Sequence, residues 1–190
     1  MPQSICVFSS SSEAVAPEFF QVAAHLGAGL ARRRFTLLYG GGRVGLMGAL
    51  ARSVHQHGGR VVGVIPGFLR EREIAYEAAD ELIVTRDLRE RKAVLEARAD
   101  AFIALPGGFG TLEEILEILT LKQLQQHNKP VVFLNTGGFF DPLLEFFNRL
   151  YDGRFAKEAY RQLYHAATGP DEAFAYVERY QPAPAVSKWF

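Results

Sequence analysis

The 190-residue sequence has little cysteine, no excess charge and no long apolar run. Its one cysteine, Cys6, cannot form an internal disulfide, which is compatible with a cytoplasmic protein. The 21 Lys and Arg residues balance the 21 Asp and Glu residues, so we expect no nucleic-acid or anionic-membrane partner. No apolar run approaches the ~20 residues that span a bilayer. Residues 1–4 lack the features of a secretory signal, so none is expected.

Several catalytic and metal-binding motifs are also missing. The sequence has no P-loop of the form Gly-x-x-x-x-Gly-Lys-Ser/Thr and no Gly-x-Ser-x-Gly nucleophile elbow, and residues 9–12 are interpreted as loop caps or phosphate ligands. The five histidines are scattered without an accompanying cluster of acids or cysteines, so no zinc site is expected. No lysine lies in a recognisable Schiff-base motif for pyridoxal phosphate. We therefore predict that the protein uses no metal and no cofactor.

The composition is that of an ordinary globular domain, with 48% hydrophobic and 22% charged residues. Short apolar runs alternate with helical patterns along most of the chain. The predicted strands are residues 5–8, 35–39, 60–65, 81–84, 101–105 and 130–134. The predicted helices are residues 17–33, 45–57, 87–98, 111–126 and 141–151, with two weaker helical segments after them. Residues 67–80 are expected to form a long loop or a short irregular helix.

Continuously apolar strands separated by helices indicate a parallel sheet that is covered on both faces. With right-handed crossovers, this pattern predicts an α/β fold, a Rossmann-like doubly wound parallel sheet with helices on both faces. We expect a single domain over residues 1–180 and a loose tail over residues 181–190.

Two glycine-rich segments, residues 39–48 and 105–114, lie at the ends of predicted strands. Glycine lets backbone N–H groups approach a ligand, and the start of the following helix adds its positive dipole end. Such a site commonly binds phosphate, and ligands of doubly wound sheets bind beyond the carboxyl ends of the strands. A tight turn without a ligand remains the alternative for either segment. The expected substrate contacts in the first segment are Gly41, Gly42, Gly45 and Met47.

The first segment matches a dinucleotide-binding fingerprint only literally. Gly40, Gly42 and Gly45 have the spacing Gly-x-Gly-x-x-Gly. The next predicted strand ends at Ile65-Pro66, without the acidic residue that would bind a ribose hydroxyl. NAD(P) binding is therefore not expected.

The second segment opens a strongly apolar helix. Thr111 lies where this helix is expected to begin and is predicted to cap it or to contact a phosphate. Glu113 and Glu114 are predicted in its first turn, where dipole compensation alone could explain them. At about 100° per residue, the face predicted to pack on the core comprises Leu112, Ile115, Leu116 and Leu119. Glu114 would point nearly opposite, beside Ile118 and Leu121, which suggests that a subunit contact borders the site.

The stretch Pro106–Glu114 matches the P-G-G-x-G-T-x-x-E signature of the LONELY GUY family of cytokinin riboside 5′-monophosphate phosphoribohydrolases. Further matches are residues 39–48, 63–66, 91–92, 100–105, 123–124 and 129–131, so the resemblance runs from Cys6 to about Leu150. Families of this kind are often labelled "possible lysine decarboxylase". The resemblance implies a homodimer or larger even assembly. It also implies hydrolysis of the N-glycosidic bond of AMP or N6-modified AMP, releasing free base and ribose 5-phosphate.

The resemblance also implies roles for individual residues. Arg91 and Glu114 correspond to the catalytic pair, in which a carboxylate stabilises charge on the sugar or activates water and a guanidinium binds phosphate or sugar oxygens. The implied substrate contacts are Glu73, Lys92, Gly107, Gly108, Gly110, Thr111, Glu113 and Thr120. Three departures, at residues 9–12, 88–89 and 120–121, leave the catalytic pair intact and bear on the specificity for the base.

Two other functions compete with this interpretation. One is a non-catalytic nucleotide-binding or sensor protein of the same fold, for which a carboxylate near the sugar would be unnecessary. The other is a decarboxylase, which only the common label of the family suggests. The presence of both Arg91 and Glu114 favours the hydrolase.

Overall fold

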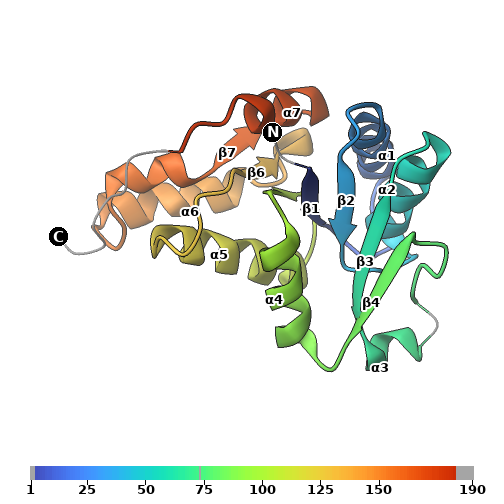
Figure 1. The fold of residues 1–190 in the computed structure, drawn as a ribbon. Coiled ribbons are helices and arrows are strands. Elements are labelled where there is room, and N and C mark those ends of the chain that lie inside the picture. The colour runs from blue at the N-terminus through green and yellow to red at the C-terminus, as the bar shows by residue number, and fades with distance from the viewer. Residues whose placement is uncertain (1–2, 73, 183–190) are drawn as a thin grey trace.

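The computed structural model describes residues 3–72 and 74–182, which form a seven-stranded sheet flanked by helices (Figure 1). Neighbouring strands are parallel throughout, in the order β4-β3-β2-β1-β5-β6-β7. The strands are β1 (Ser4–Phe8), β2 (Thr36–Tyr39), β3 (Val61–Pro66), β4 (Glu81–Thr85), β5 (Ala101–Ala104), β6 (Val131–Leu134) and β7 (His165–Ala167). This topology confirms the predicted doubly wound α/β fold.

Helices cover both faces of the sheet. One layer consists of α1 (Pro17–Arg32), α2 (Gly45–Gln56) and α7 (Pro170–Arg179). The opposite layer consists of α4 (Leu88–Arg98), α5 (Phe109–Gln123) and α6 (Asp141–Asp152). Shorter elements are α3 (Gly67–Arg70) and the 3-10 turns η1 (Thr136–Gly138) and η2 (Glu158–Leu163). None of the helices in the described chain combines the length and the apolar character needed to cross a membrane.

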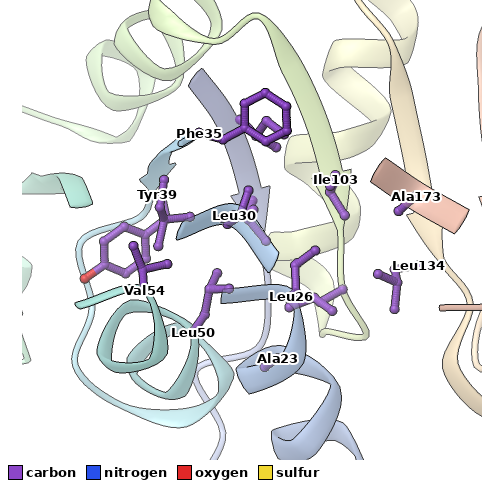
Figure 2. Packing of buried hydrophobic residues seen from close by; sticks show 14 of the residues in the cluster. Ala23, Leu26, Leu30, Phe35, Tyr39, Leu50, Val54, Ile103, Leu134 and Ala173 are labelled. Carbon is purple, nitrogen blue, oxygen red and sulfur yellow. The ribbon is translucent and has the colours of Figure 1, made fainter. Parts of the chain in front are cut away.

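The strands are apolar on both sides because each side faces a helical layer. In β1, Ile5 and Val7 join the core under α1, α2 and α7, whereas Cys6 and Phe8 join the core under α4, α5 and α6. Figure 2 shows the first of these cores, where side chains from α1 and α2 meet those of the strands. Two separate apolar clusters therefore fix the sheet between its helices.

The C-terminal part departs from the predicted element order. The two weaker helical segments are η2 and α7, but the short strand β7 lies between them and pairs with β6 over Val132–Leu134. Strand β7 contains only a histidine and two alanines, which have no strand pattern of their own. Pairing with β6 therefore determines this strand. The predicted tail over residues 181–190 lies, from residue 183 on, outside the described residues.

The carboxyl edge of the sheet contains the topological switch point. Strand β2 pairs with β1 along one edge of β1, and strand β5 pairs with β1 along its other edge. The loops that follow β1 and β5 therefore diverge and leave a crevice between them, which is where doubly wound sheets bind ligands.

Candidate active site at the switch point

A cavity of about 500 Å³ opens at the carboxyl edge of the sheet. Its walls come from the segments that follow β1, β2, β3 and β5 and from two side chains of α4 and α5. The lining residues are Val7, Phe8, Ser9, Ser10, Ser11, Ser12, Gly40, Gly42, Met47, Ile65, Leu69, Ile74, Arg91, Gly108, Phe109, Gly110, Thr111 and Glu114. The cavity thus combines backbone donors, apolar side chains and one pair of opposite charges.

That charged pair is Arg91 on α4 and Glu114 on α5. Arg91 Nη1 lies 2.9 Å from Glu114 Oε1, and the two side chains are only 13% and 10% exposed. Arg91 Nε also donates a hydrogen bond of 3.1 Å to the carbonyl oxygen of Val64 in β3. The fold therefore brings together the two residues predicted to be catalytic, although they are 23 positions apart in the sequence.

Burial sets the acidity of Glu114. Removal of the carboxylate from water raises the pKa of Glu114 above its ordinary value, and the positive charge of Arg91 works in the opposite direction. The two groups depend on each other, because removing one partner of a buried ion pair costs about 3–5 kcal/mol. A carboxylate held in this way has a higher proton affinity than one at the surface.

The N-terminus of α5 faces the cavity and has no side-chain cap. The helix begins at Phe109 with Gly108 as its N-cap, two residues before the predicted start, so the proposed capping role of Thr111 is wrong. The first backbone N–H groups of any helix lack partners within that helix, and together with the helix dipole they attract anions. Gly108, Phe109, Gly110 and Thr111 line the cavity at this point. The site can therefore accept one phosphate group.

Gly107 supports this arrangement from outside the cavity lining. A Cβ atom at this position would overlap Thr111 Oγ1 and lie 2.6 Å from Thr111 Cβ. Thr111 itself is buried, so it could not move aside easily. Gly107 thus makes room for the first turn of α5, and a direct substrate contact by Gly107 stays a prediction.

The first glycine-rich segment behaves differently, because the N-terminus of α2 is already occupied. The carbonyl oxygen of Ser10 accepts hydrogen bonds from the backbone N–H groups of Leu46 and Met47, at 3.0 and 3.4 Å. A Cβ atom at Gly45 would lie 2.7 Å from the carbonyl oxygen of Ser11. The loop after β1 thus occupies the N–H groups at the N-terminus of α2, so an anion site at this helix is not favoured.

The four contacts predicted in this segment fall into two groups. Gly42 and Met47 line the cavity, whereas Gly41 and Gly45 are not among the described residues that do so. Gly41 and Gly45 adopt φ angles of 75° and 58°, a region that favours glycine. Their role in the described structure is to shape the turn.

Lys92 and Glu113 lie outside this cavity. Lys92 Nζ pairs with Glu113, and it lies 2.7 Å from Glu117 Oε2. Lys92 lines a second cavity of about 370 Å³ between α4 and α5, and Glu114 also lines this second cavity. A direct contact of Lys92 or Glu113 with a ligand in the first cavity is therefore not favoured.

Two further predicted contacts cannot be assigned to the cavity. The Thr120 hydroxyl donates a hydrogen bond of 2.8 Å to the Leu116 carbonyl, on the outer side of α5. Nine positions separate Thr120 from Thr111, which places them on opposite sides of the helix. Glu73 lies outside the described residues.

The predicted helical phase of α5 is wrong in part: Ile115 and the three leucines pack on the core as expected, but Glu114 and Ile118, expected on the opposite side, are buried as well. The buried residues of α5 are Thr111, Glu114, Ile115, Ile118 and Lys122. Leu112, Leu116 and Leu119, predicted to face the core, are partly exposed. Apolar residues cover most of the circumference of this helix, and the exposed residues Glu113, Glu117 and Thr120 form only a narrow polar stripe, so its periodicity could not select the inner face. Glu114 lies on the core side, which explains its burial.

Sequence reasoning missed the apolar part of the cavity wall. Ile65, Leu69 and Ile74 come from the end of β3 and the segment that follows it. The general rule that long loops carry function and the predicted contact of Glu73 pointed to this segment, but neither identified these apolar side chains. Within the described chain, no group of three or more His, Cys, Asp or Glu side chains could hold a metal ion.

These features define a Rossmann-like α/β protein whose cavity contains both an uncapped helix N-terminus and a buried Arg–Glu pair. Residues 47–177 match the family model described as "Possible lysine decarboxylase". The chain is 44% identical over 178 residues to cytokinin riboside 5′-monophosphate phosphoribohydrolase LOG7 of Arabidopsis thaliana, covering 94% of this chain and 82% of that protein. The protein named LOG5 from the same plant is 41% identical over 189 residues, covering 97% and 83%. The chain therefore belongs to the cytokinin riboside 5′-monophosphate phosphoribohydrolase family.

A solved structure supports the fold. The molybdenum cofactor carrier protein of Chlamydomonas reinhardtii superposes with a TM-score of 0.70 at 26% sequence identity. The match covers 94% of this chain and 98% of that one. The same fold therefore supports proteins whose names describe different functions.

Proposed function

We propose that the protein hydrolyses the N-glycosidic bond of AMP or N6-modified AMP, that is, a cytokinin riboside 5′-monophosphate, and releases free base and ribose 5-phosphate. The buried Arg91–Glu114 pair in the cavity that contains the open end of α5 carries this proposal. The names of the curated relatives support the same reaction.

The phosphate group of the substrate binds at the N-terminus of α5. Backbone N–H groups of Phe109, Gly110 and Thr111 would donate to its oxygens, with help from the helix dipole. Glu114 follows one turn later on the same helix, at the inner side of the cavity. A ligand anchored by its phosphate therefore extends its ribose toward this carboxylate.

The chemistry requires a negative charge near the sugar. Cleavage of a ribosyl C–N bond builds positive charge on the ribose ring. The Glu114 carboxylate stabilises that charge or activates the attacking water. Arg91 favours the ionised form of Glu114, because its positive charge opposes the effect of burial.

The base occupies the apolar part of the cavity. Met47, Ile65, Leu69 and Ile74 offer side chains suited to the faces of a purine. Both unmodified and N6-modified adenine belong to the proposal, and the assay below separates them.

A lysine-dependent decarboxylation has no support in the cavity. None of the described residues that line it is a lysine. Lys92, the nearest candidate in the sequence motif, pairs with Glu113 and Glu117. A non-catalytic nucleotide-binding protein remains as one outcome of the assay.

We further propose that residues 1–180 act as one catalytic domain in a cytoplasmic homodimer or larger even assembly. Apolar residues cover most of the circumference of helix α5, and a groove of about 300 Å³ lies between α5, α6 and η2. Leu116 and Leu119 line this groove together with Thr120. Because Thr120 lines this groove and not the main cavity, any contact of Thr120 with a substrate in such an assembly would be with the substrate bound by a second copy.

The test is an assay with AMP and with isopentenyl-AMP. We expect free base and ribose 5-phosphate in equal amounts from at least one of them, measured by chromatography. Absence of release from both at high protein concentration would overturn the hydrolase. Nucleotide binding in calorimetry under those conditions would then identify the non-catalytic alternative.

A further inference from the structure

The guanidinium group of Arg91 is held from three directions. Its Nε atom donates to the carbonyl oxygen of Val64 at 3.1 Å, and Nη1 lies 2.9 Å from Glu114 Oε1. The third neighbour is Gly40, the first residue after β2. A Cβ atom at Gly40 would overlap Arg91 Nη2 and lie 3.2 Å from Arg91 Cζ. The guanidinium therefore occupies space that any other residue at position 40 would fill.

We infer that Gly40 is a positioning residue for Arg91, whose guanidinium can pair with Glu114 only because position 40 has no side chain. The catalytic consequence of this inference rests on the proposed function. Its structural part, the dependence of the ion pair on Gly40, does not.

The backbone at Gly40 gives no other reason for glycine. Its φ angle lies outside the left-handed region, in contrast to 75° at Gly41. An alanine could therefore adopt the conformation of Gly40 without backbone strain. A Cβ atom there would also lie 3.3 Å from Met47 Sδ, so its overlap with the guanidinium is the tightest contact at this position.

An alanine at position 40 would displace the side chain of Arg91. The overlapping atom is the end of a long side chain, which can rotate away more easily than backbone. Such a rotation breaks the contacts of Arg91 with Val64 or Glu114. The buried carboxylate would then lose the charge that compensates it, while the fold remains.

The experiment compares Gly40→Ala, Arg91→Ala and the double variant. We expect Gly40→Ala to lower kcat about 100-fold, because a displacement of about 1 Å in an active site can have this effect. The acid limb of the pH profile of kcat/KM should move to higher pH, because Glu114 then lacks its positive neighbour. In the Arg91→Ala background, Gly40→Ala should change kcat by less than about twofold and should leave the acid limb of the kcat/KM profile in place, since the two changes remove one interaction.

The matched control is Gly67→Ala. Gly67 also follows a strand at this edge of the sheet, and a Cβ atom there would meet no heavy atom closer than 3.8 Å. This variant should keep the parent kcat and pH profile. An unchanged Gly40→Ala variant, or an effect of equal size in the Arg91→Ala background, would overturn the inference.

A measurement without turnover separates this inference from the proposed function. The titration of the Glu114 carboxyl group, followed by carbon-13 NMR, should move to higher pH in Gly40→Ala and should not move further in the double variant. This holds even if neither nucleotide is hydrolysed, and an unchanged titration contradicts the inference. If Gly40→Ala does not fold, Gly40→Ala/Arg91→Lys should fold, because lysine lacks the Nη2 atom. An unfolded double variant would also contradict it.

Discussion

At the scale of single residues, the site depends on a carboxylate that is buried beside one positive charge. Glu114 is 10% exposed in its side chain, and its charge is opposed by burial and supported by Arg91. An exposed glutamate would be screened by water and could not concentrate its field on a neighbouring sugar. The fold therefore maintains an unfavourable charge at the place where the proposed reaction develops the opposite charge.

Replacing Glu114 with glutamine removes that charge and keeps the shape of the side chain. We expect Glu114→Gln to lower kcat by about 10²–10⁴-fold, the range typical of a lost acid–base group, with nucleotide binding still measurable. Steady-state kinetics and calorimetry provide the two readouts. Glu117→Gln, one turn further along α5, is the matched control and should retain activity. Hydrolysis by Glu114→Gln at the parent rate would contradict the assignment.

The raised pKa of Glu114 predicts a pH dependence with opposite signs for activity and stability. The ionised form is the active one, so kcat/KM should fall as pH decreases through a pKa above the ordinary 4.5. In that window the folded protein binds more protons than the unfolded chain, so the contribution of this group to stability is lost as pH rises. Activity and urea unfolding across this pH range, compared with Glu114→Gln, test both signs.

Some site residues could be identified from the sequence motif, whereas the contacts of others depend on the fold. Arg91 and Glu114 follow from the family signature, and the fold places them together. The contacts implied for Lys92 and Thr120 stay predictions that the geometry of one chain does not favour, because Lys92 pairs with two glutamates and Thr120 faces outward. Tertiary pairing of this kind leaves no trace in a linear motif.

At the scale of elements, two glycine-rich segments that look alike in sequence have different roles. The N-terminus of α5 is open, whereas the carbonyl of Ser10 accepts the first N–H groups of α2. The difference arises from the loop after β1, which lies far from both segments in sequence. The periodicity of the sequence predicts where strands and helices form. It does not predict whether the N–H groups at the start of a helix are free or already hydrogen-bonded.

Helix α5 is also tied to η2 by a buried lysine. Lys122 Nζ donates to the carbonyl oxygen of Leu163 at 2.8 Å, and burial lowers the pKa of Lys122 to about 8. Between pH 8 and the ordinary 10.5, the folded protein binds fewer protons here than the unfolded chain. Stability from this group should therefore rise with pH across that window.

The comparison with Lys122→Met isolates this effect from other groups that titrate at high pH. Urea unfolding at both ends of the window should show a larger stability gain for the parent than for the variant. Methionine keeps the length of the side chain, and the loss of the bond to Leu163 is common to both pH values. Equal gains for the two proteins would refute the assignment.

At the scale of the whole molecule, the sheet and its two helical layers follow from apolar strands alternating with helices. Strand β7 and the inner face of α5 do not, because the strand is too short and apolar residues cover most of the circumference of the helix. The partly buried leucines of α5, Leu116 and Leu119, remain the best indication of an assembly. They border the outer groove with α6, whereas Leu121, the residue expected to mark a subunit contact, lines the second cavity.

An assembly through this groove predicts a response to charge. Leu119→Lys should shift the protein toward the monomer in light scattering, because a lysine cannot be buried unpaired in an apolar contact. Val84→Lys is the matched control, since Val84 is 46% exposed on β4, the edge strand of the sheet. An unchanged mass for Leu119→Lys would place the contact elsewhere.

The order of the lining residues along the chain separates two properties of the molecule. Every described residue that lines the main cavity lies at or before Glu114. The later elements, from β6 to α7, complete the sheet, and α6 and η2 form one wall of the outer groove. Exchange of the chain beyond α5 between relatives would therefore change the outer groove without altering the residues that line the main cavity within one chain.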